Sequence, residues 1–384
     1  MTELTSSVSS QARFAVLTPR GRGAVATIGI RGEGALDLLG RRFSPANGKE
    51  LVTFGEGRAI YGQFRSSHVA PEDVVVGILG ETELEIHCHG GEAAARAISD
   101  VLAELGAEEF SPKSWCAETT SDSIATAACI ALMSAKTERA AAVLLDQYRG
   151  ALRAEIKRIA KLLTEGQSEG AKDAIKQLLC LADFGRHLTQ PWKVVFAGRP
   201  NVGKSSLMNA ILGYERSIVW PEPGTTRDVL VATTAIDGWW VELSDVAGLR
   251  ESDEQLEAAG IVKAEQQIAT ADLVVFVADS TTDWDAELHR ILCERAKRSV
   301  VVHNKRDLVS EMAEERPEGV MTSTVTGVGL QELCGKIGKA LVPEPPPNGA
   351  AVPFAEEQVR GLEAALGELL LGNLAGARDA IEFW

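Results

Sequence analysis

The hydrophobic positions of the chain change their pattern twice along its length. Between Phe14 and about Ala107, short apolar runs such as AVATIGI, VVVGIL and LEIHC alternate with glycine-rich turns and lead into EAAARAISDVLAELG. Alternating strands followed by a helical repeat predict a compact α+β unit. From Ser121 to Leu188, Ala, Leu, Lys and Glu recur at helical spacing with almost no strand signal. We expect that segment to be helical.

Beyond Lys193 the pattern becomes a series of apolar, β-rich runs separated by helical stretches. The runs are KVVFAG, WWVELSDVAG, DLVVFVAD and SVVVHNKRD, which is typical of a mostly parallel sheet with crossover helices on both faces. After a proline run at 345–347, the amphipathic stretch FAEEQVRGLEAALGELLLGNLAGARDA could pack back on the earlier helical segment. The predicted domains are therefore an N-terminal α+β domain at 11–117, a helical domain at 118–192 plus 346–384, and an α/β domain at 193–345.

A glycine-rich string, GRPNVGKSS at residues 198–206, fits GxxxxGK[ST] between a strand and a helix. This context predicts an α/β P-loop domain, in which Gly198 and Gly203 turn backbone N–H groups toward a phosphate. Lys204 would reach the outer phosphates, and Ser205 would ligate Mg²⁺. Taken alone, the motif could also be a glycine-rich turn between a strand and a helix that binds no ligand. The predicted phosphate-binding residues are Asn201, Val202, Gly203, Lys204, Ser205 and Ser206.

Two motifs that respond to a γ-phosphate follow in the expected order. In PEPGTTRDV, the Thr226 hydroxyl could complete a magnesium shell when a γ-phosphate is bound. The next apolar run ends in Asp245, and with Gly248 it forms a DxxG motif whose aspartate meets the water shell of the magnesium ion. Its place at the carboxyl end of a strand is where such ligands bind.

The motif NKRD at residues 304–307 predicts that the base is guanine. The Asp307 carboxylate can accept from both N–H donors on the edge of guanine, whereas adenine would present an acceptor there. This preference makes GTP, rather than ATP, the expected nucleotide. The predicted base-site residues are Asn304, Lys305, Asp307 and the following Ser323, which fits the loop that covers the base.

The residue after DxxG is Leu249, so the glutamine that orients the attacking water in Ras-like enzymes is missing. Hydrolysis then needs another catalyst. A hydrophobic residue at this place indicates a GTPase that uses a monovalent cation and a second carboxylate. Asn201 in the phosphate loop is placed to help hold that cation.

Composition narrows the class of partner. The chain of 384 residues has 54 acidic and 39 basic residues and a net charge of −15, which argues against DNA binding or a broad RNA-binding surface. The six cysteines lack CxxC pairs and are expected to be buried thiols in a reducing compartment. His87 and His89 share a strand face but lack a third metal ligand. We find no apolar run long enough for a membrane span and expect a cytoplasmic protein.

The motifs GRPNVGKSS, GTTRD, DVAGLRESDEQLEAAGI and NKRD, with TPRGRGAVATIGIRG and LEIHCHGG nearer the N-terminus, resemble the MnmE (TrmE) family of tRNA modification GTPases. The resemblance implies a folate-binding N-terminal domain that forms a homodimer, a two-part helical domain and a potassium-dependent G domain. It also implies a flavoprotein partner and tRNA wobble-uridine modification. In this pattern Asn201 would bind K⁺, Ser205 and Thr226 would bind Mg²⁺, and Glu257, Lys204 and Thr226 would be catalytic.

The chain departs from the family pattern in its folate site and at its end. Glu85 is kept as a ligand for a tetrahydrofolate derivative, but Gly29 stands where the family has arginine and Thr120 where it has lysine. The chain stops at GARDAIEFW instead of a Cys-x-Gly-Lys tail. Two alternatives stay open beside tRNA modification: a GTP-driven switch without folate chemistry, and a ribosome-assembly GTPase.

Overall fold

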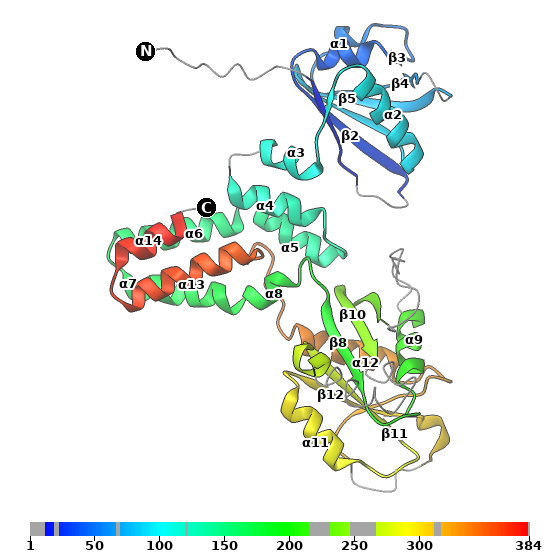
Figure 1. The fold of residues 1–384 in the computed structure, drawn as a ribbon, viewed down its shortest axis with the longest axis vertical. Coiled ribbons are helices and arrows are strands. Elements are labelled where there is room, and N and C mark those ends of the chain that lie inside the picture. The colour runs from blue at the N-terminus through cyan, green and yellow to red at the C-terminus, as the bar shows by residue number, and fades with distance from the viewer. Residues whose placement is uncertain are drawn as a thin grey trace, which may run out of the picture. The chain divides into compact units, whose positions relative to one another are not determined.

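The computed structural model describes residues 12–18, 23–66, 70–119, 122–214, 231–245, 266–310 and 316–382. The chain divides into two compact units, Met1–Thr126 and Ala127–Trp384 (Figure 1). The first unit holds one sheet with helices. The second holds a helical part and a second sheet. The exact domain boundaries given above stay a prediction.

The first unit is built on a seven-stranded sheet with the order β3-β4-β5-β6-β2-β1-β7. All neighbouring strands are antiparallel except β1 and β7, which run parallel. The strands are β1 (Arg13–Val16), β2 (Val25–Arg31), β3 (Phe43–Pro45), β4 (Arg58–Phe64), β5 (Glu72–Gly80), β6 (Glu83–His89) and β7 (Glu108–Glu109). The helical elements are α1 (Ala35–Gly40), η1 (Leu51–Thr53), α2 (Glu92–Glu104) and α3 (Pro112–Thr119).

The core of the first unit lies between the sheet and helices α1 and α2 (Figure 1). Alternate residues of β2 point to opposite faces, so Ile28 and Ile30 enter this core while Thr27 and Arg31 lie on the other face. Ile98 of α2 packs from the helical side and is 1% exposed. The predicted α+β architecture is confirmed.

The second unit begins with helices that the last part of the chain completes. They are α5 (Glu138–Tyr148), α6 (Ala151–Thr164), α7 (Ser168–Cys180) and α8 (Ala182–Arg186), after α4 (Ser123–Leu132), which crosses the division. The final helices, α13 (Glu356–Leu370) and α14 (Leu374–Glu382), pack on each other and against α7 and α6. Gln147 of α5 holds the returning chain, because its side chain bonds Ala350 O at 3.0 Å and Val352 N at 3.1 Å. The amphipathic stretch near the C-terminus therefore packs back on the earlier helices, as the sequence predicts.

A six-stranded sheet with the order β13-β12-β11-β8-β10-β9 forms the rest of the second unit. Only the β9–β10 pair is antiparallel. Its elements are β8 (Trp192–Ala197), α9 (Lys204–Tyr214), β9 (Val231–Ile236), β10 (Trp239–Asp245), β11 (Leu273–Asp279), α11 (Ala286–Arg295), β12 (Ser299–Asn304), η3 (Arg306–Leu308), β13 (Val320–Met321) and α12 (Leu330–Leu341). The predicted fold class, a mostly parallel P-loop sheet with helices on both faces, is confirmed.

Four cysteines, Cys88, Cys180, Cys293 and Cys334, are free. Of these, Cys88 and Cys334 are buried, Cys293 is partly exposed and Cys180 is exposed. Cys116 and Cys129 each carry a disulfide in place of a free thiol. The expectation of six buried thiols is therefore wrong at four positions, Cys116, Cys129, Cys180 and Cys293. Within the described ranges, each helix is too short or too polar to cross a membrane.

Candidate nucleotide-binding site

The phosphate loop connects the end of β8 to the start of α9 and needs glycine at two places. Gly198 has a φ of 146° and Gly203 a φ of 95°, and Asn201 between them is also left-handed at 64°. A Cβ on Gly198 would lie 2.2 Å from the carbonyl oxygen of Val277, and one on Gly203 would lie 2.4 Å from Asn304 Nδ2. Both glycines therefore let the loop approach β11 and β12 closely.

Lys204, the first residue of α9, is folded into this loop and is only 4% exposed. Its Nζ donates to the carbonyl oxygens of Gly198 at 3.2 Å and Arg199 at 3.0 Å. These bonds satisfy the ammonium group at the inner side of the loop. The buried apolar residues Leu207 and Ile211 then anchor α9 on the sheet, so that its N-terminus faces the loop.

The predicted magnesium ligand and the predicted DxxG aspartate meet at the next strand. Ser205 Oγ donates to Asp245 Oδ2 at 2.7 Å, and Asp245 is the last residue of β10, with 2% of its surface exposed. Two oxygen-bearing side chains forty residues apart in sequence are thus adjacent. The predicted residues Thr226, Gly248 and Glu257 lie outside the described residues.

Asn304 joins the predicted base-reading motif directly to the phosphate loop. It ends β12 and is 1% exposed. Its Nδ2 donates to Val202 O at 2.9 Å, and its Oδ1 accepts from Thr322 Oγ1 at 3.1 Å. Both ends of the amide are therefore satisfied, and the carboxyl end of β12 is fixed against the loop that follows β8.

Lys305 is held by an aspartate that the sequence reasoning did not identify. The Lys305 Nζ lies 2.6 Å from Asp279 Oδ2, and Lys305 itself is left-handed with a φ of 61°. Burial alone would raise the pKa of Asp279, but hydrogen bonds from Lys305 and Thr281 outweigh it and lower the pKa below its usual value. Its place at the carboxyl end of β11, in DLVVFVAD, was the available signal.

Asp307 and Ser323 flank the same end of the sheet. Asp307 lies in η3 and is exposed, so its carboxylate is accessible. The neighbouring Arg306 N donates to Thr322 O at 3.0 Å, which ties η3 to the segment after β13 that holds Ser323. Ser323 is 1% exposed, and its Oγ accepts from Thr326 N at 3.2 Å. Its hydroxyl therefore stabilises the turn that follows β13.

Glu85 of the predicted folate site lies on the face of the first sheet opposite its core. It is paired in register with Gly29 on one neighbouring strand and Gly77 on the other. His87 on the same strand has its Nε2 3.4 Å from Glu85 Oε2 and its Nδ1 3.1 Å from Thr27 Oγ1. Within the described ranges, no group of three or more His, Cys, Asp or Glu side chains is placed to hold a metal ion.

Trp115 of α3 fills the space next to Gly29. A Cβ at Gly29 would lie 2.5 Å from Trp115 Cζ2, and the indole is 5% exposed. The Arg31 guanidinium stacks on this ring at 4.2 Å from the centroid and is itself bonded to Glu83 at 2.6 Å. Thr120, aligned with the family lysine, lies outside the described residues. A side chain at position 29 would therefore have to displace a held indole ring.

The fold and the site define the chain as a P-loop GTPase. A family model described as "50S ribosome-binding GTPase" matches residues 193–305. The chain is 32% identical over 372 residues to the tRNA modification GTPase MnmE of Moorella thermoacetica, covering 84% of this chain and 80% of that protein. It is 31% identical over 426 residues to the protein of the same name from Synechococcus sp. (strain CC9605), covering 98% and 92%.

The chain belongs to the MnmE family, and it is a GTP-binding protein with a GTPase domain. Among solved structures, the G domain of the T. maritima FeoB iron transporter is 30% identical over 39% of this chain, with a TM-score of 0.30. That score adds nothing to the assignment.

Proposed function

We propose that this protein is a Mg²⁺-dependent, potassium-stimulated GTPase that acts in modification of the tRNA wobble uridine. The single observation that carries the GTPase part is the Asn304 amide, which joins the guanine-reading motif to the phosphate loop through Val202. Membership of the MnmE family supports the tRNA part, since the relatives are named tRNA modification GTPases. We further propose a cytoplasmic homodimer that works with a flavoprotein partner and tRNA.

The residues present fit a magnesium ion beside the phosphates. The Ser205 hydroxyl and the Asp245 carboxylate lie 2.7 Å apart, and both offer the hard oxygen atoms that Mg²⁺ prefers. A bound Mg²⁺ would neutralise charge on the phosphate oxygens. In the proposal Ser205 and Thr226 hold this ion. Asn201, exposed at the crest of the loop, helps hold K⁺.

The protein's own groups position GTP and stabilise the charge that develops during hydrolysis. The Lys204 ammonium exchanges its loop carbonyls for the outer phosphate oxygens. Asp307 accepts from the two N–H donors of guanine, while Lys305, held by Asp279, lines the base site. Glu257 positions the attacking water through further solvent. Water adds to the γ-phosphorus as its bond to the bridging oxygen of GDP breaks, which releases phosphate.

A second candidate, a GTP-driven switch without folate chemistry, is favoured by one observation. Trp115 occupies the space beside Gly29 on the face that carries Glu85, where the family resemblance places an arginine of the folate site. In this candidate the first unit serves dimerisation or partner binding. Calorimetry with a one-carbon-loaded tetrahydrofolate separates the two: binding by the wild-type chain supports the tRNA-modifying function, and no binding supports the switch.

The test of the tRNA-modifying function is complementation. Cells that lack their own MnmE protein receive this chain or its Lys204→Ala variant, and wobble nucleosides are quantified by mass spectrometry. We expect modified uridine with the wild-type chain and none with the variant. If neither restores it while the purified chain hydrolyses GTP, the tRNA-modifying function is wrong and the switch remains.

A further inference from the structure

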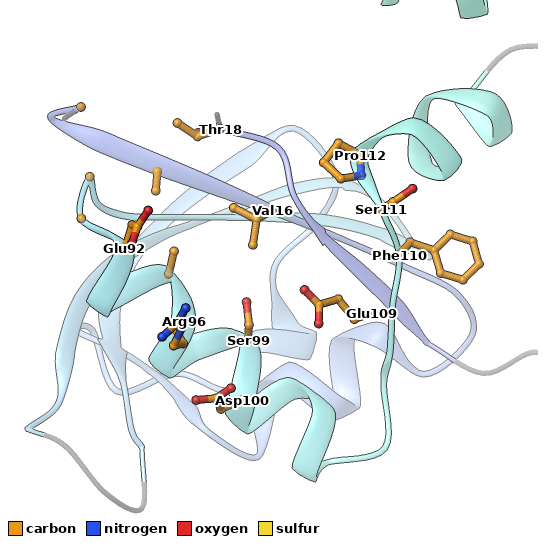
Figure 2. A pocket seen from close by; sticks show the side chains of 15 residues that line it. Val16, Thr18, Glu92, Arg96, Ser99, Asp100, Glu109, Phe110, Ser111 and Pro112 are labelled. Carbon is orange, nitrogen blue, oxygen red and sulfur yellow. The ribbon is translucent and has the colours of Figure 1, made fainter. Parts of the chain in front are cut away.

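A cavity of about 690 Å³ lies in the first unit between helix α2, β1 and the segment that follows β7 (Figure 2). Its apolar walls include Val16, Ala26 and Ala95. Ala26 points to the core side of β2, whereas Gly29, the partner of Glu85, points to the opposite face. The cavity is therefore separate from the predicted folate face and from the GTPase site.

Ser99 gives this cavity an unsatisfied polar group. The residue is only 9% exposed, and its Oγ is buried without a hydrogen-bond partner among the described residues. Figure 2 shows the hydroxyl directed from α2 into the cavity, and Ser99 is one of the lining residues. Because buried polar groups are nearly always hydrogen-bonded, this hydroxyl indicates a place for a polar atom of a ligand.

Charged groups of both signs line the cavity without neutralising each other. Arg96 lies one turn before Ser99 on α2, and Glu109 of β7 lies across from Ser99 (Figure 2). Among the described residues no ion pair or hydrogen bond joins Arg96 to Glu109 or to Asp100. A ligand that carries a cation at one end and an anion at the other could satisfy both signs at once.

The start of α2 adds a further acidic residue to the cavity. Glu92 lines it and lies in the first turn of this thirteen-residue helix, where its carboxylate offsets the partial positive charge of the helix N-terminus. Arg96 is therefore the group of the cavity that suits an anion. Gly90 and Gly91 both line the cavity. A Cβ on Gly90 would lie 2.1 Å from Gly23 O, so only glycine allows the two chain segments to meet there.

We propose that this cavity binds a zwitterionic small molecule through complementary charges at its two ends. Its ammonium or guanidinium group is bound by Glu109, its carboxylate by Arg96, and its apolar stem lies between them. Ser99 bonds a polar atom of the ligand. Carboxylates outnumber the single arginine around the cavity, which disfavours a polyanion such as an RNA backbone. Arg96 disfavours a purely cationic ligand.

Titration calorimetry of the full chain with L-arginine tests the proposal. Agmatine lacks the carboxylate of L-arginine, and citrulline replaces its guanidinium by a neutral group, so each should bind at least about tenfold more weakly. The substitutions Glu109→Gln and Arg96→Gln should each weaken L-arginine binding by about tenfold or more, and Ser99→Ala by a few-fold. The control Glu81→Gln, an exposed residue outside the cavity, should leave it unchanged.

Three results would overturn the proposal. One is the absence of binding by L-arginine. The second is an affinity that Glu109→Gln and Arg96→Gln leave unchanged, and the third is equal binding of agmatine and L-arginine. Circular dichroism and the urea midpoint of each variant show whether the first unit is folded, because GTP turnover reports only on the second unit. Loss of ligand binding with unchanged circular dichroism and normal turnover therefore tests the cavity independently of the proposed GTPase function.

Discussion

Replacing Asn304 by alanine should disconnect the base-reading end of the G domain from its phosphate loop. The amide is 1% exposed and joins Val202 O at 2.9 Å to Thr322 Oγ1 at 3.1 Å. Alanine removes both bonds and leaves a carbonyl oxygen and a hydroxyl without partners in a buried place. Val202 is 6% exposed and Thr322 is fully buried, so neither group can turn freely to water.

The expected loss follows from the cost of these two orphaned groups. Each buried, unsatisfied polar group costs about 1–3 kcal/mol. Some relaxation and entry of water will reduce the sum, so we expect Asn304→Ala to lower the free energy of unfolding of the G domain by about 2–4 kcal/mol. Asn209→Ala is the matched control, because Asn209 is exposed on α9 and its loss should change stability by less than about 0.5 kcal/mol.

Urea unfolding followed by tryptophan fluorescence measures the difference, since Trp192 in β8 and Trp239 in β10 are buried in this sheet. The midpoint for Asn304→Ala should fall with an unchanged slope. A loss no larger than that of Asn209→Ala would refute the reasoning. It would mean that the Asn304 amide does not hold the two loops together in solution.

Other variants test individual roles in the site and in the sheet. Lys204→Ala should abolish tight GTP binding in a fluorescent-nucleotide titration, because the loop loses its only side-chain ammonium at the phosphates. Asp307→Asn should reduce the preference for GTP over xanthosine triphosphate, since the amide presents a donor to guanine N–H groups. Glu257→Ala should slow turnover by about tenfold or more while sparing affinity, and unchanged turnover would remove Glu257 from the mechanism. Burial lowers the pKa of His303 below its ordinary 6.5. The contribution of this group to the free energy of unfolding should therefore be fully present above pH 6.5 and be lost as the pH falls through the folded pKa, because the unfolded chain takes up the proton first. His303→Gln should flatten this dependence in urea midpoints measured between about pH 7.5 and 5.5.

The longer elements could be predicted because their burial repeats along the sequence. β8 and β11 are buried on both faces and read as continuous apolar runs, and α13 shows Leu362, Ala365 and Leu369 at helical spacing. The two-residue strands β7 and β13 carry no such signal. They are strands only because their backbones pair with β1 and β12. That pairing depends on which segments the fold brings together, which the local sequence does not indicate.

The site was predictable where a motif fixes residues close in sequence. The phosphate loop and NKRD place their side chains through local geometry at strand ends. The pair of Lys305 with Asp279, the bond from Asn304 to Val202 and the packing of Trp115 on Gly29 join distant segments. These contacts follow from strand order and register, which one sequence does not specify.

Steady-state GTP turnover by the purified chain in potassium buffer and in sodium buffer tests the central claim most directly, with Lys204→Ala as the inactive control. We predict Mg²⁺-dependent hydrolysis that is at least about tenfold faster in potassium. Nucleotide binding with no hydrolysis above the level of Lys204→Ala in either buffer would contradict the claim.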